Sequence, residues 1–155
     1  MANKIIWEAP TVAYVNYLTT ELNALADITT VLGAAINNET NLCTHMDLEL
    51  TLASLDLSSA ASPAVRIYML ECIDGGTDFD SGEATATPSL IPPFSKICAI
   101  MPLRLAAGAE AKLAVKSMIP IPPGRFKLMP MNNTGVAWGE TGNILAYRTY
   151  NLNSV

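Results

Sequence analysis

The sequence predicts an all-β protein, a two-sheet antiparallel β-sandwich of the jelly-roll kind. Three observations lead to this prediction. The longest apolar segment has a period of two, turn residues recur about every ten positions, and prolines are spread through the second half of the chain, where they would interrupt helices. We expect a single sandwich domain over residues 19–155. Residues 1–18 would precede it as an N-terminal arm, a first strand or a short helix.

The clearest strand lies in NLCTHMDLELTLASL, residues 41–55. One parity carries apolar side chains, at Leu42, Met46, Leu48, Leu50 and Leu52. The other parity carries Cys43, His45, Asp47, Glu49 and Thr51. This alternation predicts a strand with one face in the core and the other facing solvent or a partner.

Five more strands are expected along the chain. The segment AVRIYMLECI, residues 64–73, is apolar on both parities, which indicates a central strand that is covered on both faces. Strand-length runs follow at residues 96–105, 111–121, 125–131 and 143–151, separated by turn sequences such as PPG and NNTG. This spacing leaves no room for the helical crossovers of βαβ units.

The N-terminal third is ambiguous. Helical spacing is met by Val12, Val15, Leu18, Leu22 and Leu25. However, Leu22, Ala24 and Ala26 also alternate, and the threonines nearby favour a strand. If residues 22–28 and 31–38 are strands, the total reaches about eight, the number in a jelly roll.

Composition excludes several classes of function. The net charge is −5 and the nine Lys and Arg residues are scattered, which argues against nucleic-acid binding. No apolar run approaches the ~20 residues of a membrane span, and the first ten residues lack the apolar core of a signal peptide. We therefore expect a protein made in the cytoplasm. Three cysteines without a CxxC pair indicate reduced packing residues.

His45, Asp47 and Glu49 form the first candidate site. Their spacing puts all three on one face of the strand, and histidine with carboxylates is a ligand set for zinc, iron or manganese. In a metal-dependent jelly-roll enzyme such ligands point into the barrel, whereas here the leucines hold the inward parity. We therefore favour a surface that faces solvent or another subunit, and expect no metal or other cofactor.

The acidic stretch DGGTDFDSGE is the second candidate site. Its carboxylates, at Asp74, Asp78, Asp80 and Glu83, are of the type that binds calcium. The spacing departs from the EF-hand pattern, and Asp-Gly and Gly-Gly dipeptides are strong turn formers. A solvated loop is the favoured interpretation.

Aromatic residues give a third set of candidates. Trp7, Tyr14 and Tyr17 precede the first clear strand, and they would either contact a partner or cap the core of the chain itself. Trp138, Tyr147 and Tyr150 would be the stacking platform of a carbohydrate-binding module if they were exposed. We expect no catalytic residues, because His45 is the only histidine and no Gly-x-Ser-x-Gly elbow or P-loop is present.

Three motifs resemble a known family. Ala35-Ile36-Asn37-Asn38 is followed by Thr40-Asn41-Leu42, and Tyr68-Met69-Leu70 by Asp74-Gly75-Gly76. The third motif is IPIPPGRFKLMPMNNTGVAWGETGNILAYRTYN, residues 119–151. Together they resemble small structural proteins of tailed-bacteriophage particles, over residues 22–151. Cys43 and His45 depart from the pattern, which has Tyr or another ordinary strand residue there.

The resemblance implies a jelly-roll decoration or cement protein on the capsid surface of the virion, without catalytic residues. Its partners would be the major capsid protein and further copies of itself, as a dimer or trimer, with neither nucleic acid nor membrane involved. A tail or fibre component is the alternative. Half of the residues are hydrophobic and the mean hydropathy is +0.29, which is high for a small soluble monomer and also indicates partners.

Overall fold

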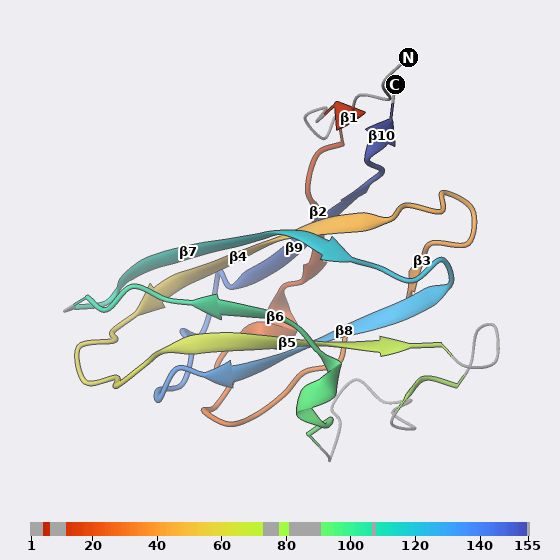
Figure 1. Ribbon diagram of the computed structural model, residues 1–155. Coiled ribbons are helices and arrows are strands. Elements are labelled where there is room, and N and C mark those ends of the chain that lie inside the picture. Colours follow the sequence, from red (N-terminus) through yellow and green to blue (C-terminus); the bar gives the residue numbers. More distant parts are fainter. Residues whose placement is uncertain (1–4, 7–11, 73–77, 81–90, 107, 155) are drawn as a thin grey trace.

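The computed structural model describes residues 5–6, 12–72, 78–80, 91–106 and 108–154, and eight of its strands form two stacked antiparallel sheets (Figure 1). The first sheet has the order β2 (Val15–Leu18), β9 (Ile144–Tyr150), β4 (His45–Leu55), β7 (Glu110–Pro120). The second has the order β3 (Ile36–Asn37), β8 (Arg125–Asn133), β5 (Ala64–Glu71), β6 (Ile97–Pro102). The predicted two-sheet antiparallel β-sandwich is confirmed.

Four short elements complete the described fold. β1 (Ile5–Ile6) pairs with β10 (Asn153–Ser154) in a two-stranded sheet, which Figure 1 shows beyond one end of the sandwich. Two short 3-10 helices, η1 (Thr20–Leu22) and η3 (Phe94–Lys96), precede β3 and β6.

The eight sandwich strands pair in a nested order. β2 pairs with β9, β3 with β8, β4 with β7, and β5 with β6. The first and third of these pairs lie in the first sheet, where β4 also pairs with β9. The second and fourth lie in the second sheet, where β5 also pairs with β8. A long two-stranded ribbon that is folded over on itself gives this order.

Strand β4 follows the predicted parity. Met46, Leu48, Leu50 and Leu52 are all fully buried in the core between the sheets. Leu42 is an exception, because it is 56% exposed and has a φ of 46°, outside the strand. The reason is a tight loop held by Asn38, whose Oδ1 accepts the Cys43 N–H and whose Nδ2 donates to the Cys43 carbonyl, both at 2.8 Å. The strand therefore starts at His45.

Strand β5 is central and buried on both faces, as predicted. It lies between β8 and β6. Val65 and Ile67 belong to the core between the sheets. A second apolar cluster covers the other face of this sheet, and it consists of Leu32, Tyr68, Leu70, Phe79, Met129 and Met131.

Both predictions for residues 22–28 are wrong. Apart from Leu22 at the end of η1, the segment is neither helix nor strand, because Ala24 and Ile28 have φ of 53° and 59°, which interrupts either periodicity. Its N–H groups find other partners: Ala24 donates to the Gly139 carbonyl at 3.0 Å and Ile28 to the Asn132 carbonyl at 2.8 Å. In residues 31–38 only Ile36–Asn37 forms a strand. The eighth strand is instead β2, within residues 1–18.

Asn132 ties two loops together at one end of the sandwich. Its Nδ2 donates to the carbonyls of Leu25 and Val136, both at 2.8 Å. Its Oδ1 accepts the N–H and the hydroxyl of Thr134 at 2.9 and 2.7 Å. Asn132 is fully buried, so the NNTG motif is a structural clip.

We expect Asn132→Ala to lower the free energy of unfolding by about 2 kcal/mol or more, because the buried Thr134 and two partly buried carbonyls lose their partner. Asn133→Ala is the matched control, since no hydrogen bond of its side chain to the described residues is found. Urea denaturation measures both variants, and equal losses would contradict this role for Asn132.

Candidate functional site

The outer face of the first sheet gathers the sequence-predicted trio and three residues that sequence analysis did not connect with it. His45, Asp47 and Glu49 all project from this face, opposite the buried leucines. The register places Tyr150 beside His45 and Arg148 beside Asp47, on the neighbouring strand β9. Tyr14 completes the group, with the Arg148 guanidinium 4.6 Å from the centre of its ring.

Asp47 is the centre of this cluster and is only 2% exposed. Its Oδ2 accepts two hydrogen bonds from Arg148, from Nε at 3.0 Å and from Nη2 at 2.8 Å. Its Oδ1 accepts the Met118 N–H and the Tyr150 hydroxyl, both at 3.0 Å. Both carboxylate oxygens are therefore used inside the fold, and Asp47 joins strands β4, β7 and β9.

These contacts set the protonation of Asp47. Burial alone would raise the pKa of its carboxyl, but the hydrogen bonds from Met118, Arg148 and Tyr150 and the charge of Arg148 outweigh burial and lower the pKa below its ordinary value. Asp47 is thus a carboxylate at neutral pH and a partner for the guanidinium.

The other two members of the trio make different contacts. The His45 ring stacks on the Tyr150 ring, with centres 6.0 Å apart, and its Nδ1 lies 2.9 Å from the Thr44 hydroxyl oxygen. Glu49 has no hydrogen bond or ion pair with the described part of the chain. Among the described residues no group of three or more His, Cys, Asp or Glu is arranged to hold a metal ion. The three side chains lie on one face of β4, as predicted. Asp47 has a structural role there, because its carboxylate holds Arg148 of β9.

The three predicted contact aromatics differ in their roles. Tyr17 belongs to the core: its hydroxyl donates to the Ala34 carbonyl at 2.6 Å and accepts the Leu128 N–H at 3.0 Å, which links β2 to the opposite sheet. A side chain at Gly33 would collide with its ring. Tyr14 lies over Arg148 on the outer face. Trp7 lies outside the described residues.

The acidic loop is described only in part. Asp74 and Glu83 lie outside the described residues. Asp80 forms an ion pair with Lys96 of η3. The backbones of Phe79 and Cys72 form an isolated antiparallel β-bridge. Asp80 therefore anchors the described part of the loop to the rest of the fold, while the hypothesis of a calcium site stays untested.

The proposed glycan platform is not assembled. Trp138 is 3% exposed, and its Nε1 has no hydrogen-bond partner in the described part of the protein. Tyr147 packs edge-on against Tyr17 in the core, with ring centres 5.8 Å apart. Only Tyr150 of the three lies on the outer face, where His45 stacks on it.

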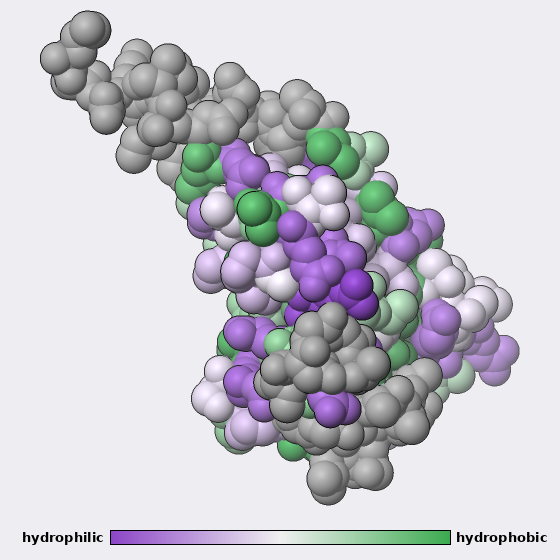
Figure 2. All heavy atoms as spheres, turned by 90° about the vertical axis from the view of Figure 1, so that its right-hand side faces the viewer, coloured by the Kyte–Doolittle hydropathy of each residue, from purple (hydrophilic) through white to green (hydrophobic). Residues whose placement is uncertain are grey.

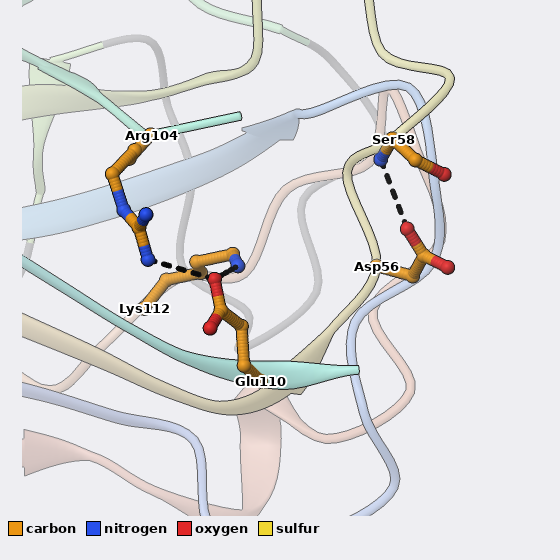
Figure 3. Close-up of polar contacts among 5 residues, drawn as sticks. All are labelled: Asp56, Ser58, Arg104, Glu110 and Lys112. Atoms are coloured by element: carbon orange, nitrogen blue, oxygen red, sulfur yellow. Dashed lines mark hydrogen bonds and ion pairs between the residues drawn. The ribbon is translucent and has the colours of Figure 1, made fainter. Parts of the chain in front are cut away.

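A second charged cluster, which sequence analysis missed, lies at the start of β7 (Figure 3). Glu110 Oε1 accepts from Arg104 Nη2 and from Lys112 Nζ, both at 2.8 Å. The Lys112 side chain is only 3% exposed. Lys112, through its hydrogen bond, holds the pKa of Glu110 below its ordinary value. Asp56 lies nearby and accepts the Ser58 N–H at 2.9 Å (Figure 3).

The cysteines are free thiols, and Cys43, Cys72 and Cys98 are each partly buried. Burial raises the pKa of Cys98 to about 12, so this thiol stays protonated at neutral pH. Cys98 is therefore a packing residue and a poor nucleophile.

Comparison with protein-family models, with curated proteins and with solved structures gives no match for this chain. Within the described residues, no helix has the length and apolar character to cross a membrane. From its own chemistry the site is a surface on which Asp47 and Arg148 are paired with each other within the fold.

We expect Asp47→Asn to lower the free energy of unfolding at pH 7 by about 2 kcal/mol or more, because Arg148 loses a buried partner. The contribution of Asp47 is complete above the unfolded pKa of about 3.9 and disappears as pH falls through the lower folded pKa. The difference between wild type and variant should therefore shrink in acid.

Glu49→Gln, on the same face, is the matched control, and its effect should stay below about 0.5 kcal/mol at either pH. Denaturant unfolding at pH 7 and pH 3 measures both variants. A loss for Asp47→Asn that is the same at the two pH values would contradict the role of the carboxylate.

We expect Tyr17→Phe to destabilise the protein by about 1–3 kcal/mol, because the N–H of the buried Leu128 and the carbonyl of the exposed Ala34 lose their partner. Tyr14→Phe keeps the ring over Arg148 and removes a hydroxyl that has no hydrogen bond to the described residues, so it should cost less than about 0.5 kcal/mol. Thermal and urea unfolding of the pair provide the test. Equal effects would show that Tyr17 does not link the sheets in this way.

Proposed function

We propose that the protein is a non-enzymatic structural component of a tailed-bacteriophage particle, which decorates and stabilises the capsid through protein–protein contacts. Its partners would be the major capsid protein and further copies of the chain itself. The proposal comes from the sequence resemblance. The structural observation that supports it most is that large apolar side chains lie at the surface, although the sandwich already has a filled core.

The fold supports the proposal in its topology. The nested pairing of β2 with β9, β3 with β8, β4 with β7 and β5 with β6 is the order expected for a jelly roll, in which a long ribbon wraps into two sheets. We infer on this ground that the sandwich is a jelly roll. The pair β1 and β10 lies beyond the end of the sandwich in Figure 1, and we propose that it is an arm that contacts a neighbouring subunit.

The surface supports the proposal in its composition. Large hydrophobic side chains that are at least 36% exposed occur at Val12, Val15, Ile28, Leu42, Ile91, Phe94, Ile100, Leu105, Leu113, Val115, Met118 and Leu152. On the face in Figure 2 apolar residues appear as separate green spots among polar ones. Several of the exposed residues lie on or beside β6 and β7, the neighbouring edge strands in Figure 1. Exposed apolar side chains of this kind are suited to contacts with other subunits.

The polar clusters are consistent with this role. The Asp47 oxygens accept hydrogen bonds from Arg148, Tyr150 and the Met118 N–H, and these bonds stabilise the first sheet. Glu110 Oε1 accepts from the Arg104 and Lys112 side chains. A cement protein needs this stability and works by adding buried area between neighbouring capsid subunits.

Purified phage particles provide the test. We expect the chain to be a particle component, in a copy number comparable to that of the major capsid protein, as quantified by mass spectrometry. A few copies per particle would indicate a tail or fibre component and would contradict capsid decoration, as would absence from the particle.

Particles that lack the chain should release their DNA at a lower temperature than complete particles, because contacts between capsid subunits are lost. Adding back the purified protein should restore the higher temperature. Unchanged stability without the chain would contradict a cementing role.

A further inference from the structure

We propose that two copies of the chain pair through the outer edge of β7, as antiparallel strands in a register centred on Leu113. This inference specifies the self-association named in the proposed function, and the occupant of the edge is a second copy of the same strand. The first sheets of two protomers would then join into one continuous sheet.

The backbone of β7 is available for pairing. It is the last strand of its sheet and pairs with β4 on one side. On its other side no strand pairs with it within the described part of the chain. Open strand edges of this kind are templates for another strand, and strand addition is a common mode of recognition.

The straight part of β7 is limited to residues 110–116. The pairing with β4 shifts register twice. Between Leu52 and Leu55 the extra residue lies on β4, opposite the stretch of β7 from Lys112 to Glu110. Between Met46 and Leu48 the extra residue lies on β7, which passes from Ile119 to Lys116. At this irregularity Met118 has a φ of 60°, and its N–H bonds to Asp47 instead of continuing a regular ladder. The part of β7 without an extra residue of its own, residues 110–116, has Leu113 at its midpoint.

The side chains of this segment are sorted by face. Ala111, Leu113 and Val115 lie on the outer face, opposite the inward parity of Leu50 and Leu52 on β4. All three are exposed, Leu113 by 66% and Val115 by 54%. An apolar row at a sheet edge is covered when the same row of a second strand lies beside it.

A two-fold axis at Leu113 makes this segment complementary to itself. Residues opposite each other in an antiparallel pair share a face. Leu113 would meet Leu113 of the second copy, and Ala111 would meet its Val115. On the other face Glu110 would meet Lys116 of the second copy, and this opposite-charge pair occurs twice because the interface is symmetric.

The lysines disfavour the adjacent registers. A two-fold axis at Lys112 would oppose Lys112 to itself, and an axis at Ala114 would oppose Lys112 to Lys116. Like charges that lie directly opposite each other are destabilising. The register centred on Leu113 instead sets Lys112 against Ala114.

Glu110 has an acceptor for the second copy. Arg104 and Lys112 both donate to its Oε1 (Figure 3), and no group in the described residues bonds to Oε2. Oε2 can accept from Lys116 of the second copy, whose side chain is exposed at the other end of the segment. The contact is small, so we expect a weak dimer whose population rises with concentration.

A disulfide tests the register directly. In Leu113→Cys the two introduced thiols would be opposite each other, with Cα atoms about 4.5–5.5 Å apart, which a disulfide can span. In Val115→Cys, an equally exposed control, the thiols would be about 14 Å apart from strand spacing and rise. Mild oxidation of each purified full-length variant, with wild type as the control for the native thiols, is followed by non-reducing electrophoresis.

We expect at least several-fold more linked dimer for Leu113→Cys than for Val115→Cys or wild type. Equal linking, or more linking for Val115→Cys, would overturn the register. No linking above wild type for either variant, at the highest soluble concentration, would overturn the pairing.

Sedimentation velocity supplies a second measurement. Leu113→Lys should remain monomeric at concentrations where wild type forms dimer, whereas Val12→Lys, an equal charge change at another exposed apolar position, should behave as wild type. Wild type that stays monomeric would overturn the proposal. These experiments use the purified chain alone, so their failure is distinct from absence of the chain from phage particles.

Discussion

The buried row of Met46, Leu48, Leu50 and Leu52 on β4 is the constraint from which the other features follow. β4 is hydrogen-bonded on both sides, to β7 and to β9, and its inward side chains are fully removed from water. A shift of one residue would exchange core and surface along the whole strand, so the leucines fix the register of both neighbours. The same register decides which side chains of β7 and β9 lie beside each other on the outer face.

One consequence is that the outer face of the first sheet carries a buried carboxylate that is paired within the fold. The register that buries Leu48 also brings Asp47 beside Arg148 and under the Tyr150 hydroxyl. Four hydrogen bonds compensate the burial of the carboxylate. The cluster joins three strands on the face that the leucines leave outside, and its charges are paired within the chain.

The outer faces of the two sheets differ in polarity and in how they are covered. The second sheet has an apolar outer face, which a separate cluster around Tyr68 and Phe79 covers within the same chain. The first sheet has a polar outer face that ends in an apolar edge at Leu113 and Val115. The chain therefore leaves apolar surface where a strand of another molecule could continue the sheet, and this contrast connects the fold with the proposed self-association.

By itself the sequence determined the all-β class, the parity of β4, and the central place of β5, because side-chain alternation and turn residues are local signals. Tertiary structure alone decided the path of residues 22–28, where Ala24 and Ile28 take positive φ to donate to distant carbonyls. It also decided the role of Asp47 and the cluster of Arg104, Glu110 and Lys112, since these partners meet only when strands distant in the chain are paired. Spacing along one strand shows which face a residue occupies. Whether a carboxylate on that face binds a metal, a solvent molecule or an arginine depends on the neighbouring strand.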